Sequence, residues 1–215
     1  MQVFNLDVLG LNCHLNVKRA SKIVFRHPAF AQADVFVLKR ILKELRNSNP
    51  KIYEIGCWTG QSTAVLAEYA KENKGHVYAI DTFDGRGSRL EKIAVNENIY
   101  DIFVQTMEKL NLLEYITIIR NSSDVVWPEI ENESIDFLFI DGDHRYGQIK
   151  KDLDHWWLKI KKGGILCGHD CEGKEYDEKY INEDFVNQRH HGVCKAVFEK
   201  FPDVKLDYIL WWIKK

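Results

Sequence analysis

The chain has 215 residues, of which 45% are hydrophobic and 29% are charged, and its formal net charge is −2. This length and composition predict one globular domain with a sizeable core, and the balanced charge argues against nucleic-acid and membrane-surface partners. No apolar run is long enough to cross a bilayer, and the N-terminus lacks the pattern of a signal peptide. Five cysteines at irregular spacing are typical of reduced thiols, so we expect a cytoplasmic protein.

Helical and strand patterns alternate along the chain after Pro28. Apolar residues at helical spacing predict a first helix within residues 29–45. Strands are expected at residues 51–55, 76–81, 115–120, 135–140 and 165–168, and helices at 61–73, 93–110, 148–160 and 193–201, with a turn at 161–164 and a terminal strand or hairpin at 206–213.

This alternation requires right-handed crossovers and therefore predicts an α/β fold with a mostly parallel sheet. We expect a single doubly wound, Rossmann-like domain over residues 47–215, with helices on both faces of the sheet and an antiparallel C-terminal strand. Residues 1–46 are expected to form an N-terminal extension and a helix that packs on this core.

A glycine turn follows the first predicted strand, and an acid ends the second. Glu54, Gly56 and Gly60 leave the strand as Glu-x-Gly-x-x-x-Gly, and Asp81 follows about twenty residues later. Glycines allow close backbone approach, and a carboxylate at this place can accept hydrogen bonds from ribose hydroxyls, so the pattern indicates a nucleoside site. The spacing differs from the dinucleotide fingerprint, and Gln61 stands where a phosphate-binding loop would carry lysine.

Polar residues also end the other predicted strands. Because ligands collect at the carboxyl ends of the strands of an open α/β sheet, we expect these residues to line one site. They are Ser122 and Ser123 after the third strand, Asp141, Asp143 and His144 after the fourth, and His169 and Asp170 after the fifth.

Three segments together resemble one family of class I S-adenosylmethionine-dependent methyltransferases. Residues 54–63 (EIGCWTGQST), 137–146 (FLFIDGDHRY) and 162–170 (KGGILCGHD) are similar to the methyltransferase 24 family. This family includes macrolide-sugar O-methyltransferases and cephalosporin-hydroxylase-like proteins, and it is related to catechol O-methyltransferases. The resemblance covers residues from about 50 to about 200 and does not specify the acceptor.

The resemblance implies S-adenosylmethionine as cofactor. Glu54, Gly56 and Gly60 would line its methionine part, Asp81 would hold the ribose, and Ser122 with Ser123 would lie beside the adenine. This chain has Asn121-Ser-Ser where the family often has Gly-Asp-Ser. The full set of cofactor-binding candidates is Glu54, Gly56, Trp58, Gly60, Ser62, Asp81, Ser122, Ser123 and Asp141.

The resemblance further implies a divalent metal and a general base. Asp141, His169 and Asp170 match the metal-binding positions of several family members, and the histidine shifts the expected preference from Mg²⁺ toward Mn²⁺, Fe²⁺ or Zn²⁺. His144 matches the position of the general base, and His169 is the alternative base if it does not bind the metal.

We therefore expect a methyltransferase (EC 2.1.1.-) that modifies an oxygen of a small molecule or sugar, with metal assistance and homo-oligomer formation left open. A different class is a cofactor-binding protein of the same fold with lost or hydroxylase-like catalysis. Each motif also has an ordinary structural interpretation: Asp81 as a turn or helix cap, Asp141-Gly-Asp143 as a turn, and His144 as a surface histidine.

Overall fold

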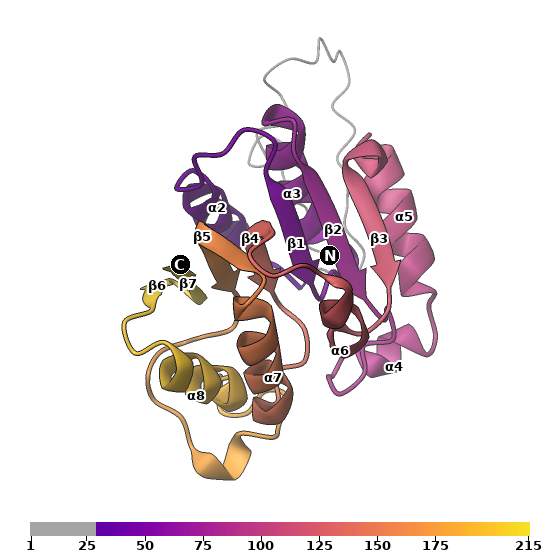
Figure 1. The fold of residues 1–215 in the computed structure, drawn as a ribbon. Helices are drawn as coiled ribbons and strands as arrows, with labels where there is room; N and C mark the ends of the chain where they lie inside the picture. Colours follow the sequence, from indigo (N-terminus) through magenta and orange to yellow (C-terminus); the bar gives the residue numbers. More distant parts are fainter. Residues whose placement is uncertain (1–28) are drawn as a thin grey trace.

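The computed structural model describes residues 29–215 (Figure 1). The expected N-terminal extension before residue 29 lies outside the described residues. The centre of the fold is a seven-stranded sheet in the order β3-β2-β1-β4-β5-β7-β6. Its strands are β1 (Lys51–Ile55), β2 (His76–Asp81), β3 (Ile116–Arg120), β4 (Ile135–Ile140), β5 (Ile160–Gly168), β6 (Lys205–Asp207) and β7 (Leu210–Lys214).

The first five strands pair in parallel, and β7 inserts antiparallel between β5 and β6. Ile55 of β1 lies opposite both Ile80 of β2 and Ile140 of β4, so the carboxyl ends of the three central strands reach the same edge. The predicted Rossmann-like α/β fold with a mostly parallel sheet and an antiparallel C-terminal strand is confirmed.

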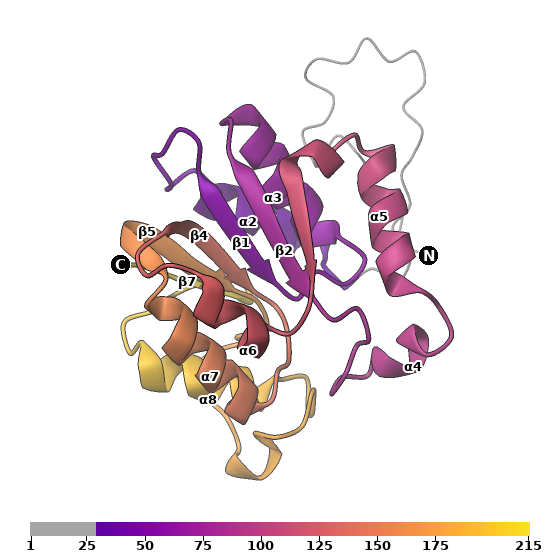
Figure 2. The same cartoon turned by 45° about the vertical axis from the view of Figure 1, so that its right-hand side comes forward.

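Helices cover both faces of the sheet, as Figures 1 and 2 show. Side chains of α2 (Gln32–Leu42), α3 (Gln61–Glu72) and α5 (Ile99–Lys109) share one buried cluster with the sheet. A second cluster joins the other face to α7 (Tyr146–Trp157) and α8 (His191–Lys200). Residues of β4 alternate between the two clusters, because successive strand residues point to opposite faces. All six β4 residues are buried, as expected of a strand covered on both sides.

Two predicted boundaries were wrong. The single helix expected over residues 93–110 is divided into α4 (Glu91–Ala94) and α5, because the Asn98 side chain caps α5 by accepting the N–H of Asp101. The turn expected at 161–164 belongs to β5, which begins at Ile160. A shift in register against β4 absorbs this glycine-containing stretch inside the strand.

Short helical elements connect the rest of the chain: α6 (Ser123–Val126) and three 3₁₀ turns at Leu113–Tyr115, Trp127–Glu129 and Glu178–Tyr180. Among the described residues, no helix has the length and apolarity that a membrane span needs.

Candidate active site

Two adjoining cavities open at the carboxyl ends of the strands. The β2–β3 cavity encloses about 1070 Å³, part of it open to solvent, and is bordered by Trp58, Asp81, Asn121, Ser122, Ser123 and Gln148 among others. The β4–β5 cavity encloses about 680 Å³ and is bordered by Phe30, Trp58, Arg89, Asp141, His144 and Asp170 among others. Gly56, Trp58 and Asp141 border both cavities, so the two spaces meet at the tips of β1 and β4.

Gly56 is required by the close approach of β1 to β4. Its φ is +85°, and a Cβ at this position would lie 2.0 Å from the carbonyl oxygen of Asp141. The backbone N–H of Gly56 donates to Ile80 at 2.9 Å, and that of Asp141 donates to Ile55 at 2.8 Å. The backbone of Gly56 is thus hydrogen-bonded to the end of β2. Because glycine has no Cβ, the Asp141 backbone can lie directly against the turn.

Glu54 lies behind the turn and borders neither cavity. Its side chain is fully buried, and its two oxygens accept hydrogen bonds from Ser62 and Thr63 at 2.5 Å each. Burial raises the pKa of Glu54 to about 8, although both hydroxyl groups oppose that rise. In this structure Glu54 fixes the first turn of α3, and Ser62 is its partner while also bordering the β4–β5 cavity.

Asp81 is held by the same turn. Its Oδ2 accepts the backbone N–H groups of Cys57 and Trp58 at 2.7 and 2.8 Å, and its Oδ1 accepts that of Phe83 at 2.7 Å. Burial raises the pKa of Asp81, and these three hydrogen bonds act against the rise. Asp81 therefore acts as a cap of this turn. Because a carboxylate has about four acceptor positions, Asp81 also retains acceptor capacity, and it borders the β2–β3 cavity.

The far wall of the β2–β3 cavity follows β3. Ser122 and Ser123 both border the cavity, and Ser123 also donates its hydroxyl to Asp152 at 2.6 Å. Burial raises the pKa of Asp152 to about 7. Gln148 lies 3.4 Å from both Asp124 and Asp152. Two acids, Asp124 and Asp152, therefore lie beside this wall of the cavity.

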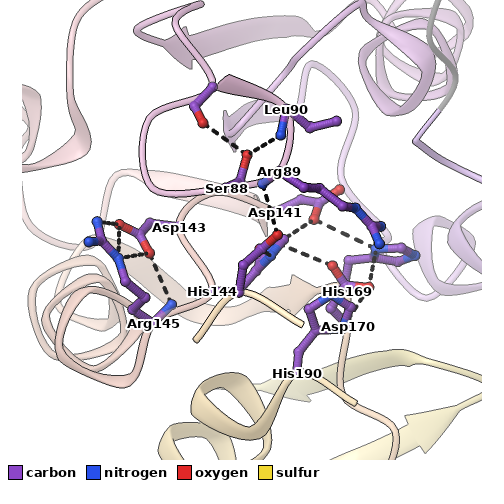
Figure 3. A network of polar contacts seen from close by, with 12 residues as sticks. Ser88, Arg89, Leu90, Asp141, Asp143, His144, Arg145, His169, Asp170 and His190 are labelled. Carbon is purple, nitrogen blue, oxygen red and sulfur yellow. Dashed lines mark hydrogen bonds and ion pairs between the residues drawn. The ribbon is translucent and has the colours of Figure 1, made fainter. Parts of the chain in front are cut away.

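Carboxylates and imidazoles gather in one network at the β4–β5 cavity (Figure 3). Asp141, His169 and Asp170 each place a ligand atom within 4.8 Å of the other two. Nδ1 of His169 lies 3.1 Å from Asp170 Oδ1 and 3.6 Å from Asp141 Oδ1. Asp170 holds a left-handed φ of 62°, which aims its carboxylate between the imidazoles.

His144 faces the same two carboxylates from the other side. Its Nε2 lies 3.1 Å from Asp170 Oδ2 and 3.6 Å from Asp141 Oδ1, and its Nδ1 lies 2.7 Å from Asp184. Burial acts to lower the pKa of His144, but Asp170, Asp141 and Asp184 outweigh it and raise that pKa to about 10.

His169 also lies between carboxylates, and its side chain is more deeply buried than that of His144. Only 5% of its side chain is exposed, its Nδ1 faces Asp141 and Asp170, and its Nε2 lies 3.3 Å from Asp34. Burial disfavours its charged form, yet Asp170 and Asp141 raise its pKa well above the usual value. Both predicted histidines therefore stand in one group with the predicted acids.

These side chains fit a divalent cation. Asp141, Asp170 and His169 offer two carboxylates and one imidazole, and the buried Nε2 of His144 beside them has no hydrogen bond within the described part of the chain. Such a mixed nitrogen and oxygen set suits Mn²⁺, Fe²⁺ or Zn²⁺ better than an all-oxygen Mg²⁺ site.

Comparison with known proteins identifies the family. The profile of the methyltransferase 24 family, described as "Methyltransferase domain", matches residues 53–171, which is more than half of the chain. The chain belongs to this family. The matched segment begins within β1 and ends just after Asp170, so it contains the glycine turn, Asp81 and the Asp141/His169/Asp170 group.

Two curated relatives of this chain are named as uncharacterized proteins. One is an uncharacterized protein (R132) of Acanthamoeba polyphaga mimivirus, 29% identical in an alignment of 140 residues that covers 61% of this chain and 58% of the relative. The other, from Sinorhizobium fredii (y4gI), is 28% identical over 64 residues, 30% of this chain and 7% of the relative. The chain thus spans less than two thirds of either relative.

Solved structures share the fold of this methyltransferase 24 member at low identity. A SAM-dependent O-methyltransferase from Thermotoga maritima has a TM-score of 0.53 and 17% identity, with 81% of this chain and 52% of that chain covered. TomG from Streptomyces achromogenes is an O-methyltransferase of tomaymycin synthesis in complex with SAM. It has a TM-score of 0.56 and 11% sequence identity, with 86% of this chain and 79% of TomG covered. CalS11, a TDP-rhamnose 3'-O-methyltransferase of calicheamicin biosynthesis, has a TM-score of 0.55 and 11% sequence identity, with 84% of this chain and 78% of CalS11 covered.

Several site residues of this methyltransferase 24 member were missed from the sequence. Asp34 lies before the family segment, and Asp184, Glu172 and His190 lie beyond it or at its edge. His190 Nδ1 lies 2.7 Å from Glu172 and 3.4 Å from Asp170. None of them ends a parallel strand, so the rule that selected the other residues could not find them.

Proposed function

We propose that the protein is an S-adenosylmethionine-dependent O-methyltransferase that acts on a small molecule or a sugar. The observation that carries the proposal is the junction of the two cavities at Gly56 and Asp141. A nucleoside in the β2–β3 cavity would direct its sulfonium end toward this junction, where an acceptor in the β4–β5 cavity can meet it. CalS11 and TomG, which share the fold, act on a nucleotide sugar and in antibiotic synthesis by their descriptions.

The cofactor would use the β2–β3 cavity. Asp81 offers its remaining acceptor capacity to the ribose hydroxyls, and Ser122 with Gln148 borders the space for the adenine. The methionine part would lie at the junction of the two cavities, where Trp58 borders both and Ser62 borders the β4–β5 cavity. Gly60 permits the turn at φ +93°. Glu54 contributes indirectly, by holding Ser62 and Thr63 in place.

The reaction is an in-line displacement. An acceptor oxygen forms a bond to the methyl carbon while the carbon–sulfur bond breaks, S-adenosylhomocysteine leaves, and the acceptor's proton passes to a base. His144 is that base in our proposal, since it borders the β4–β5 cavity and its Nε2 is engaged by no hydrogen bond within the described residues. Asp184 hydrogen-bonds Nδ1 at 2.7 Å and so fixes the ring orientation.

Asp141, His169 and Asp170 would hold a divalent cation beside the acceptor. Such a cation acidifies and orients a bound hydroxyl group, and its charge offsets the carboxylates that keep His144 protonated. The three protein groups define where the acceptor oxygen sits, while Phe30 and Trp58 border the cavity and limit access of water.

Calorimetric titration tests the cofactor assignment. We expect S-adenosylmethionine and S-adenosylhomocysteine to bind, and NAD to bind more weakly or not at all. Preference for NAD would overturn the proposal. The same titration with Mn²⁺, in the wild type and in Asp141→Asn and Asp170→Asn variants, tests the cation site; each substitution should weaken Mn²⁺ binding.

A second candidate function is hydroxylase-like chemistry at the same cation site. The observation that favours it is the donor set: two imidazoles face the same carboxylates, and histidine with carboxylate is the ligand combination of non-haem Fe²⁺ oxygenases. Oxygen consumption that depends on Fe²⁺, with no methyl transfer from labelled S-adenosylmethionine to a panel of hydroxylated acceptors and sugars, would favour this candidate.

A further inference from the structure

Asp34 is a buried acid on α2 that the proposed reaction does not use. Its side chain is 1% exposed, although α2 is otherwise an ordinary amphipathic helix with apolar residues toward the core. Its Oδ2 accepts the backbone N–H of Ala31 at 2.6 Å and lies 3.3 Å from Nε2 of His169. Its Oδ1 is buried and makes no hydrogen bond within the described residues. A helix cap alone does not require this depth of burial.

The surroundings of Asp34 and His169 are apolar. The ring of Phe30 lies 5.0 Å from that of His169, and Phe30 in turn packs edge-on against Phe139 of β4. The carbonyl oxygen of His169 accepts the indole N–H of Trp211 at 3.1 Å. The imidazole is thus enclosed on its flanks, and its two nitrogens meet carboxylates on opposite sides.

The two nitrogens of a neutral imidazole are not equivalent, since one carries the proton and the other a lone pair. A cation held by Asp141 and Asp170 needs the lone pair at Nδ1, which faces them. That arrangement requires the proton at Nε2. This nitrogen is buried and makes no hydrogen bond of regular geometry within the described residues, and the carboxylate that lies beside it, at 3.3 Å, is Oδ2 of Asp34.

We propose that Asp34 is a positioning residue: it accepts the Nε2–H of His169 and so holds the tautomer whose Nδ1 binds the cation. This inference rests on the cation site of the proposed function and extends it to a helix outside the segment that identifies the family. Carboxylate partners of this kind orient metal-binding histidines, and their loss weakens metal binding by about 10–100-fold.

The test is the affinity of the folded protein for Mn²⁺, measured by electron paramagnetic resonance or calorimetry without any acceptor. Asp34→Ala removes both carboxylate oxygens, because the same Oδ2 faces His169 and caps Ala31 and an asparagine oxygen there would still accept the Nε2–H. We expect Mn²⁺ binding to weaken by about 10–100-fold. In a His169→Ala background the same substitution should cause no further loss, because its only route to the cation is absent.

A matched control separates this role from helix capping. Asn98→Ala removes the cap of α5, where Asn98 accepts the N–H of Asp101. It should lower the melting temperature and leave Mn²⁺ affinity unchanged. If Asp34→Ala behaves like Asn98→Ala, Asp34 is only a cap and the proposal fails.

The ¹⁵N shifts of His169 in the Zn²⁺-loaded protein give an independent readout. We expect the Nε2–H tautomer in the wild type and its loss in Asp34→Ala. An Nδ1–H tautomer in the wild type, or absence of Mn²⁺ binding by the wild type, would overturn the inference. Failure of S-adenosylhomocysteine binding, with the Mn²⁺ results as expected, would instead remove the methyltransferase proposal and leave the role of Asp34 standing.

Discussion

The two cavities differ in how their acids are satisfied. On the β2–β3 side, Glu54 and Asp81 receive hydroxyl and backbone N–H donors from residues of the adjoining turn and helix. On the β4–β5 side, Asp141 and Asp170 face imidazoles that approach from several distant parts of the chain. On the first side, donors of the protein itself satisfy the acids. On the second side, acids and imidazoles lie together in a charge pattern that fits a cation.

In our proposal the β2–β3 side binds the cofactor, and the β4–β5 side carries out the proton transfer. A turn whose carboxylates are already hydrogen-bonded is rigid before a ligand arrives, so it can recognise a cofactor with little reorganisation. A cluster of acids and histidines can exchange protons and cations when two of its buried imidazole nitrogens, Nε2 of His144 and of His169, make no hydrogen bond within the described residues. Changes in the two regions should therefore affect different measurements.

The largest effect is expected from His144→Ala. Loss of a general base should reduce turnover by about 100-fold or more, while S-adenosylhomocysteine affinity stays nearly unchanged. Single-turnover kinetics and calorimetry provide the two measurements. Normal turnover in this variant, together with an inactive His169→Ala variant that still binds Mn²⁺, would transfer the role of base to His169.

Gly56→Ala should damage both regions at once. The added methyl group would overlap the Asp141 carbonyl at a backbone conformation that favours glycine, so we expect a loss of about 3 kcal/mol in the free energy of unfolding. Urea denaturation measures it. Gly147→Ala is the matched control, since a Cβ there meets nothing within 4 Å. Equal stability of the two variants would contradict the role assigned to Gly56.

Asp81→Ala should weaken S-adenosylhomocysteine binding by about 1–3 kcal/mol, the range for unpaired buried polar groups. Because the substitution also leaves three backbone N–H groups without their acceptor, the melting temperature should fall as well. Mn²⁺ affinity should not change. Unaltered cofactor affinity would remove Asp81 from the cofactor site and leave it as a turn cap only.

The smallest effect concerns Glu54 and pH. The folded-state pKa of about 8 exceeds the unfolded value of about 4.5, so the folded protein binds more protons between these values and stability falls as pH rises through them. Between pH 6 and pH 7 the loss should be about 1 kcal/mol. Glu54→Gln should remove this part of the slope, as measured by urea denaturation at each pH. An unchanged slope would show that Glu54 does not titrate in this range.

The fold and the central site residues could be predicted because both depend on local patterns. A strand ending in Glu-x-Gly, or in Asp-Gly-Asp-His, carries its chemistry in adjacent residues, and parallel strands bring such ends together. Residues 54, 56, 81, 141, 144, 169 and 170 were found in this way, although their roles in binding and catalysis stay predictions.

Other features could not be read from sequence because distant elements determine them. Asp34 and Asp184 reach the histidines only after α2 and the segment before α8 pack onto the sheet. The break between α4 and α5 depends on a single capping side chain, and β5 tolerates Gly163 and Gly164 because neighbouring strands supply its pairing. Glu54 and Asp81 fit the expected nucleoside pattern, but their hydrogen bonds to the turn needed coordinates to be seen.

The insertion of β7 beside β5 has a consequence for experiments that excise part of the chain. Trp211 of β7 lies against Gly168, where even a Cβ would come within 2.3 Å of the indole, and it bonds the carbonyl oxygen of His169. A fragment cut to residues 53–171 would retain every predicted cation ligand but lose this support, along with Asp34 and Asp184. The stretch by which the family is detected is thus shorter than the cooperative unit that must fold to give those ligands their geometry.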